Sequence, residues 1–231
     1  MIEEAVILAS GKATRMNGTF KWLTPIGEEM TIARYQIKWL LAQGIKRIYV
    51  TVNAEHPPIT DPFVASLLGR YVELVVESNP TGDEPSAKKA LACTTTDCLP
   101  VINGDVITDL NLARMPRAPS IMLVHPRSPW GVFHEDGDYK IIEEKPVLPI
   151  WVSGGIYCFT REHGDEMTDE GSLAQNIVPA MLKKRRMAVY KHTGLWHAVE
   201  NWKDAEEARK ILARATKQDP GRTAVMTALP H

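Results

Sequence analysis

The sequence predicts an α/β fold: a doubly wound, mostly parallel sheet with helices on both faces, or α/β/α sandwich. Segments with strand character and segments with helix character alternate along the first half of the chain. The first of them, residues 5–9, is an apolar run that opens directly into a loop of small residues. After Asp109 strand-like segments follow one another through turns, which predicts extra strands in the second half. Strands separated by helices imply right-handed crossovers, with ligands at the C-terminal ends of the strands.

The first half alternates between the two kinds of segment. Strands are expected at residues 5–9, 48–52, 72–76 and 99–103, and helices at 30–42, 63–68 and 86–92. The helix at 30–42 carries its apolar residues at helical spacing on one face, and Gly44 follows as its stop. Ser86 has a residue type preferred at the N-cap, so we expect it to begin the third helix.

The second half reads as several strands and then two helices. Strands are expected at 121–125, 131–134, 140–144 and 155–159, and helices at 172–184 and 202–215. The Glu-Asp-Gly-Asp turn at 135–138 predicts a hairpin. The basic run 183–186 falls at a helix C-terminus, where the helix dipole favours cations. Residues 218–231 form a tail without a clear period, and no linker divides the chain, so we expect a single domain over 1–231.

Composition excludes several classes of protein. The chain has 231 residues, of which 44% are hydrophobic and 24% are charged, as in ordinary globular domains. The net charge of −1 gives no electrostatic reason to expect a nucleic acid partner. The 3 cysteines have no metal-ligand spacing, which favours a reduced cytoplasmic compartment without disulfides. The first apolar run is far too short to span a membrane, and no signal peptide is visible.

The loop that follows the first strand has the character of an anion site. Ser10 and Gly11 are followed by two cations, Arg15 and Lys21. A strand that opens into such a loop exposes a row of backbone N–H groups, which together with fixed cations suit a triphosphate. The order of residues matches neither the P-loop G-x-x-x-x-G-K-S/T pattern nor the three-glycine dinucleotide fingerprint.

Carboxylates follow other strand-like segments. Asp105, in Asn103-Gly104-Asp105, comes just after the strand at 99–103 and is a hard oxygen ligand suited to Mg²⁺ shared with phosphates. The alternative is an Asx turn that closes the strand. Glu200 is either a second metal ligand or an acid that favours the start of the last helix.

These residues together resemble the sugar-phosphate nucleotidyltransferases, in matching order from about Ala5 to Leu212. The motifs are L-A-x-G-x-G-x-R at Leu8 to Arg15, the P-K pair at Phe20-Lys21, G-D at Gly104-Asp105, E-K-P at Glu144 to Pro146, G-I-Y-x-F at Gly155 to Phe159 and the tryptophan motif at Trp196 to Asn201. The resemblance implies the fold of the nucleotide-diphospho-sugar transferases. It also implies that an NTP and a phosphorylated small-molecule acceptor give an NDP-linked product and pyrophosphate. On this basis 1–109 is the NTP-binding half and 110–217 the acceptor-binding half.

The resemblance also implies roles for individual residues. Arg15, Lys21 and Asp105 are the catalytic set, and Asp105 with Glu200 would bind Mg²⁺. The nucleotide-binding residues are Leu8, Ala9, Ser10, Gly11, Arg15, Lys21, Ser86 and Gly104. The acceptor-binding residues are Gly131, Glu144, Lys145 and Ser153. Exposed apolar residues in the second half are compatible with a homo-oligomer.

Some positions depart from the family pattern. Ala13 replaces the second loop glycine, and the gap between Arg15 and Lys21 is shorter than in the hexose-1-phosphate enzymes. Ala198 stands where many relatives carry the acid of the tryptophan motif. The phosphocholine cytidylyltransferase branch carries a further acid, which corresponds to Glu200 here.

These departures leave other functions open. The first hypothesis is transfer to a sugar 1-phosphate, and the alternative is a cytidylyltransferase for a small phospho- or phosphono-alcohol such as phosphocholine. A third hypothesis is a catalytically silent regulatory homologue, motivated by Ala13 and Ala198. The stretch 82–86 lacks the usual base-reading pattern, so the sequence does not name the base.

Overall fold

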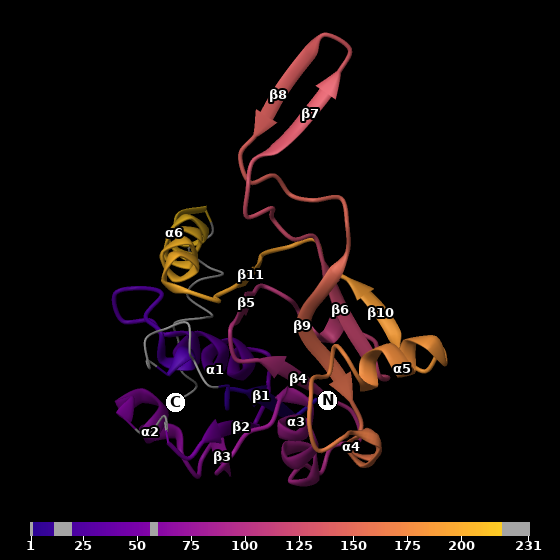
Figure 1. Ribbon diagram of the computed structural model, residues 1–231. Helices are drawn as coiled ribbons and strands as arrows, with labels where there is room; N and C mark the ends of the chain where they lie inside the picture. The colour runs from indigo at the N-terminus through magenta and orange to yellow at the C-terminus, as the bar shows by residue number, and fades with distance from the viewer. Residues whose placement is uncertain (1, 12–19, 56–59, 219–231) are drawn as a thin grey trace.

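A sheet of seven strands forms the centre of the computed structural model, which describes residues 2–11, 20–55 and 60–218 (Figure 1). The strand order is β10-β6-β9-β4-β1-β2-β3. The bounds are β1 Glu4–Leu8, β2 Arg47–Asn53, β3 Val72–Glu77, β4 Leu99–Asn103, β6 Ser120–Val124, β9 Val152–Phe159 and β10 Ala188–Lys191. β1 is parallel to β2 and β4, and only β9 runs antiparallel to its neighbours among these strands. The predicted fold class is therefore confirmed.

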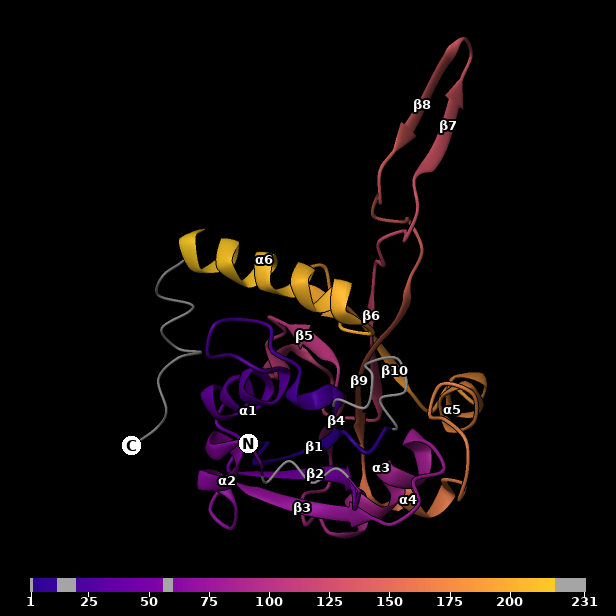
Figure 2. The same ribbon diagram turned by 60° about the vertical axis from the view of Figure 1, so that its left-hand side comes forward.

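Helices cover both faces of this sheet (Figure 2). They are α1 Ile32–Ala42, α2 Pro62–Leu67, α3 Asp83–Ala92, α4 Arg161–Glu166, α5 Ile177–Lys183 and α6 Trp202–Gln218. Ala5 and Ile7 of β1 pack in a core shared with α1, α2 and α6. Val6 and Leu8 pack in a second core with α3 and α5. Successive strand residues point to opposite faces, so a short, fully buried strand joins two cores.

Two pairs of strands lie outside the central sheet. β5 Val106–Thr108 pairs antiparallel with β11 Trp196–Ala198. β7 Val132–Asp136 and β8 Tyr139–Glu143 form the predicted hairpin, and Gly137 in its turn has φ 59°. This hairpin stands away from the rest of the molecule in both views (Figures 1 and 2).

α1 has the boundaries that its sequence signals predict. The Thr31 side chain accepts a hydrogen bond from the Arg34 N–H, which caps the N-terminus. Gly44 adopts φ 85° just beyond the C-terminus, a conformation that glycine takes without a Cβ penalty. The predicted stop at Gly44 is confirmed, and the helix starts two residues later than residue 30.

Two predicted helices have different starts. α3 begins at Asp83 with Gly82 as its N-cap, so the prediction that Ser86 begins the helix was wrong. Ser86 lies inside the helix, where its Oγ is 2.9 Å from the Gly82 carbonyl oxygen. The helix expected at 172–184 is shortened to α5, because residues 172–176 form hydrogen-bonded turns around the Ser172 carbonyl.

Several short elements were not predicted. β5, β10, β11, α4 and the 3₁₀ turns η2 Lys21–Leu23 and η4 Leu112–Arg114 each have six residues or fewer. A segment of that length is too short to show a period. In the described ranges no helix is long and apolar enough to cross a membrane.

Candidate functional site

A cavity of about 320 Å³ opens where β1 and β4 end. It is lined by Leu8, Ala9, Ser10, Gly11, Lys21, Trp22, Pro80, Gly82, Asp83, Asn103, Gly104 and Asp105. Parallel strands present their C-terminal ends at one edge of a sheet, and ligands bind at that edge. The structure thus brings the small-residue loop and the Gly104-Asp105 turn together in one hollow.

Gly104 allows these two segments to meet. Its N–H donates to the Leu8 carbonyl at 2.8 Å, so the turn after β4 lies directly against the end of β1. A Cβ at this position would stand 2.7 Å from the Leu8 oxygen and 3.2 Å from the Ala9 Cα. A glycine is therefore needed here for the close approach that places Asp105 beside the loop.

Lys21, which follows the loop after β1 in the sequence, also reaches Asp105. The flanking side chains Phe20 and Trp22 are buried, with their rings 6.4 Å apart edge to face. Between them, Lys21 extends toward the cavity, and its Nζ lies 2.7 Å from Asp105 Oδ2. The two buried rings fix the position of the Lys21 backbone. The side chain that extends from it to the ammonium is a quarter exposed.

Gln36 of α1 hydrogen-bonds both to the turn that carries Asp105 and to the segment that carries Lys21. Its side chain is fully buried, and its Nε2 donates to the backbone carbonyls of Asn103 and Val106, each at 2.9 Å. Its Oε1 accepts from Trp22 Nε1 at 2.9 Å. One buried amide thus braces the turn that carries Asp105 and the segment that carries Lys21.

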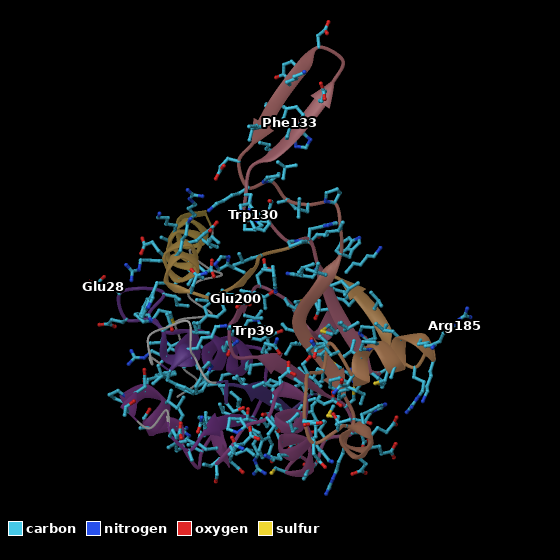
Figure 3. All side chains as sticks on the ribbon, in the orientation of Figure 1. Glu28, Trp39, Trp130, Phe133, Arg185 and Glu200 are labelled. Carbon is cyan, nitrogen blue, oxygen red and sulfur yellow. The ribbon has the colours of Figure 1, made fainter. Side chains whose placement is uncertain are left out.

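Glu200 joins the site through the pairing of β5 with β11. Ala198 pairs with Val106, and the Val199 N–H donates to the Asp105 carbonyl at 2.9 Å. Glu200 lies just before α6 (Figure 3). Its Oε2 is consequently 4.0 Å from Lys21 Nζ. Asp204 fixes this segment, because its Oδ2 accepts from the backbone N–H groups of Glu200 and Asn201.

Ser86 lies behind the cavity instead of lining it. It is fully buried, and its Oγ lies 2.8 Å from Ser10 Oγ and donates to Glu77 Oε2. Glu77 is in turn paired with Lys89 at 2.7 Å. This hydrogen-bond network holds the Ser10 side chain in the interior. Ser86 therefore positions the loop, and the backbone of Ser10 is the part of that residue left to line the cavity.

Acidic residues begin α3 at the other end of the cavity. Asp83 Oδ1 accepts from the Leu173 N–H at 2.8 Å, and Glu84 Oε1 accepts from the Thr168 N–H at 2.9 Å. Burial raises the pKa of Asp83, and the hydrogen bond from Leu173 offsets part of this rise. The start of α3 is thereby held against the 168–173 segment.

The predicted acceptor-binding residues lie elsewhere. Gly131, Glu144 and Lys145 are at the base of the β7–β8 hairpin and do not line the cavity. Lys145, at φ 49°, lines a separate hollow with α6 residues that include Lys203 and Lys210. Ser153 Oγ lies 2.9 Å from the Tyr157 hydroxyl on β9.

Arg15 lies outside the described residues, as does Ala13. Two residues that the sequence did not single out, Trp22 and Pro80, also line the cavity. Gly82 and Asp83, from the 82–86 stretch, and Asn103, from the turn before Asp105, line it as well, although no role was assigned to them. Gln36 was also missed, although a polar side chain on the apolar face of a helix is a recognisable signal.

The carboxylates beside Lys21 fit a divalent cation. The described residues contain no group of three or more His, Cys, Asp or Glu side chains that could hold a metal. Mg²⁺ bound with a nucleotide needs only one or two carboxylates, because phosphates and water complete its shell. Asp105 and Glu200 both approach one cationic nitrogen, at 2.7 and 4.0 Å. The donor set therefore suits a cation shared with phosphates.

Comparison with solved structures supports the fold of this chain. An inositol-1-phosphate CTP transferase from T. maritima superposes with a TM-score of 0.70 at 14% identity, over 94% of this chain and 97% of that chain. HddC from Yersinia pseudotuberculosis superposes with a TM-score of 0.66 at 18% identity, over 91% and 100%. At these identities the likeness establishes the fold.

Sequence comparison identifies the family. A D-glycero-alpha-D-manno-heptose 1-phosphate guanylyltransferase from Aneurinibacillus thermoaerophilus is 28% identical over 116 residues, 48% of this chain. The chain spans about half of that relative, 50% of its length. The family described as the MobA-like NTP transferase domain matches residues 5–220. The predicted resemblance to the nucleotidyltransferases is confirmed, and the chain belongs to the MobA-like NTP transferase family.

Proposed function

We propose that this chain is a nucleotidyltransferase that joins an NTP to a sugar 1-phosphate and releases pyrophosphate. The observation that carries the proposal is the meeting of Lys21, Asp105 and Glu200 beside the small-residue loop after β1. Family membership supports the NTP as one substrate. The cavity at the ends of β1 and β4 has room for part of a nucleotide, at about 320 Å³.

In this reaction the protein has mainly to neutralise the charge of the phosphates and to align the two substrates. A phosphate oxygen of the acceptor attacks the α-phosphorus in line, and the bond to the β-phosphate oxygen breaks as pyrophosphate leaves with the electron pair. A phosphate nucleophile is already ionised near neutral pH, so no general base is required. Lys21 would neutralise the approaching phosphates, and the N–H groups of the Ser10-Gly11 loop would meet the nucleotide phosphates. We assign Arg15 to the leaving pyrophosphate.

Asp105 and Glu200 are the residues that would hold Mg²⁺. When bound, the ion neutralises phosphate charge and acts as a Lewis acid. Lys21 would then exchange its contact with Asp105 for a contact with substrate phosphate. The ion pair of the free protein thus keeps both groups extended toward the cavity.

The acceptor roles of Gly131, Glu144, Lys145 and Ser153 remain part of the proposal. A sugar bound in the cavity would have to extend toward the hairpin base to contact Glu144 and Lys145. Lys145 can offer a cation to a phosphate, and Glu144 can accept hydrogen bonds from hydroxyls.

A cytidylyltransferase acting on a small phosphorylated alcohol is the second candidate. The observation that favours it is the position of Glu200, 4.0 Å from Lys21, because the phosphocholine branch carries an acid at this place in the tryptophan motif. The structural neighbour from T. maritima is named as a CTP transferase for inositol 1-phosphate. Inositol 1-phosphate and phosphocholine therefore belong among the acceptors to be tested.

Pyrophosphate release tests these functions directly. The purified protein is incubated with Mg²⁺, each of the four common NTPs, and a panel of hexose, heptose and amino-sugar 1-phosphates, inositol 1-phosphate, phosphocholine and aminoethylphosphonate. Release with a sugar 1-phosphate alone supports the first candidate, and release with phosphocholine or inositol 1-phosphate alone supports the second. Absence of both release and NTP binding would contradict the enzymatic assignment and favour the silent regulatory homologue.

A further inference from the structure

The β7–β8 hairpin exposes a concentration of apolar side chains. Of the 11 large apolar residues exposed in the described ranges, 7 lie between residues 130 and 150. We define the hairpin surface as Trp130, Phe133, Tyr139, Ile141 and Ile142, whose exposed fractions run from 43% to 74%. Figure 3 shows Trp130 and Phe133 on the projecting arm, far from the buried Trp39 of the body. Soluble monomers rarely gather so much exposed apolar surface in one segment without a function for it.

Both faces of the hairpin carry exposed apolar side chains. Phe133 pairs with Ile142, so these two side chains share one face. Ile141 pairs with His134 on the opposite face, which also carries Tyr139. A sheet that packs on a core buries one face and solvates the other, but this ribbon carries apolar groups on both. An isolated two-stranded hairpin is marginally stable in water, and the side chains of this ribbon stay exposed against the rest of the described residues, so the ribbon needs a partner surface to cover it.

The hairpin surface together with the neighbouring exposed residues Val147 and Ile150 is large enough for one side of an interface. If each of these seven side chains buried roughly 100 Å², they would contribute on the order of 700 Å² per copy, close to the ~800 Å² per partner of a standard interface. Aromatic residues are enriched in the fully buried centre of such interfaces, and Trp130, Phe133 and Tyr139 supply them.

The charges indicate a second copy of the chain as the partner. Residues 132–143 contain four carboxylates and one lysine, a net charge of −3, with Glu135 and Lys140 paired at 3.0 Å. The same chain carries exposed cations at Lys183, Lys184 and Arg185, next to the exposed Leu182. Arg186, which follows them, is paired with Glu166 at 2.6 Å. None of these four basic residues has a role in the proposed reaction. Each copy thus offers both an acidic apolar arm and a basic surface with an apolar neighbour.

We propose that the β7–β8 hairpin is a dimerisation arm that docks on a second copy of this chain. The arm would exclude water from Phe133 and Ile142 on one face and from Tyr139 and Ile141 on the other. This inference does not depend on the proposed catalytic activity, so the failure of either leaves the other standing.

Mass measurement in solution tests the proposal. Light scattering after size exclusion should give twice the 25.8 kDa of one chain at high concentration. The double variant Phe133→Glu and Ile142→Glu places charges on one face of the arm and should weaken the dimer at least about tenfold. The matched control is Val76→Glu, because Val76 is 59% exposed against 56% for Phe133 and lies on β3. It should keep the wild-type dissociation constant.

A second measurement requires no variant. Hydrogen exchange of the amides in residues 132–143 should be slow in concentrated wild-type protein and should accelerate on dilution. A wild-type mass of one chain at every concentration would overturn the proposal. A charged double variant that stays folded and dimeric like the wild type would overturn it equally.

Discussion

Lys21 and Asp105 form an ion pair, 2.7 Å from Nζ to Oδ2, across 84 residues of chain. The side chains of Lys21 and Asp105 are 25% and 21% exposed, so the pair faces the cavity and remains partly solvated. Glu200 approaches the same ammonium at 4.0 Å, so one cation separates two carboxylates. This arrangement keeps the three side chains ready for phosphates, because an arriving anion can take the ammonium and release the carboxylates.

Replacing Asp105 by alanine should abolish turnover and leave the fold intact. The loss in rate should be on the order of 100-fold or more, as for other groups that stabilise charge in a transition state. A partly exposed ion pair contributes no more than about 1 kcal/mol to the free energy of unfolding, so the melting temperature should change little. Pyrophosphate release and thermal melting measure the two effects.

The control for this variant is Glu3→Ala. Glu3 pairs with Lys46 at 2.6 Å at the opposite end of β1, on the exposed surface. This variant should keep full activity. Wild-type turnover in Asp105→Ala would show that the reaction takes place elsewhere.

Replacing Gln36 by leucine should weaken both the fold and the site. Leucine would leave the Trp22 Nε1–H and the carbonyls of Asn103 and Val106 without their partner in the core. Each unpaired buried group costs about 1–3 kcal/mol, so the melting temperature should fall markedly. Gln36 is a positioning residue, and its loss should lower kcat more than it raises KM for the NTP.

Trp22→Phe separates the parts of this effect. It removes one donor and keeps an aromatic ring, so the hydrogen bonds from Gln36 to the turn that carries Asp105 persist. Activity should then fall less than in Gln36→Leu. Equal kcat in Gln36→Leu and the wild type would rule out a positioning role.

The sequence predicted the central architecture because its elements carry clear local signals. The buried strand at the start of the chain is a continuous apolar run, and the helix ended by Gly44 is long enough to display its period. Leu8, Ala9, Ser10, Gly11, Lys21, Gly104 and Asp105 line one cavity, as expected for residues at strand ends. Local sequence was sufficient for these positions because the parallel topology brings the ends of β1 and β4 to one edge.

The remaining parts depend on contacts between distant segments. Glu200 was singled out by the family resemblance and not by local pattern, because nothing near it in the sequence indicates the register of β5 with β11 that places it beside Lys21. Ser86 was predicted at a helix start, but its partners Ser10 and Glu77 draw it into the interior. The separation of Lys145 from the cavity likewise follows from the projection of the hairpin, which local pattern does not determine.

Replacing Glu200 by glutamine should raise the Mg²⁺ concentration needed for half-maximal activity. Glutamine keeps the side-chain length but removes the negative charge that a divalent cation requires. At saturating Mg²⁺ most of the activity should return, because Asp105 remains. The control is Glu206→Gln, whose side chain is 50% exposed like that of Glu200 and lies on α6. If Glu200→Gln and Glu206→Gln showed the same Mg²⁺ dependence as the wild type, Glu200 would not be a ligand.

Replacing Asp83 by asparagine should change how stability depends on pH. Burial raises the pKa of Asp83, so folding favours its protonated form. Its contribution to stability is therefore fully present below the unfolded pKa and is lost as the pH rises through the folded pKa. Asparagine is neutral and can still accept the Leu173 N–H, so the variant should melt above the wild type at neutral pH. The difference should shrink as the pH is lowered.

Glu4→Gln is the control, because the pKa of Glu4 is shifted in the opposite direction to that of Asp83. Burial acts to raise the pKa of Glu4, but hydrogen bonds from Thr96 and Thr95 outweigh it and leave the pKa lowered. The backbone N–H groups of both threonines donate to Glu4 Oε2, at 2.7 and 2.8 Å. The contribution of Glu4 is present above its unfolded pKa and is lost as the pH falls through its folded pKa. Glu4→Gln should thus melt below the wild type at neutral pH, with the gap closing in acid. Melting curves of the two variants that shift in the same direction with pH would contradict the raised pKa of Asp83.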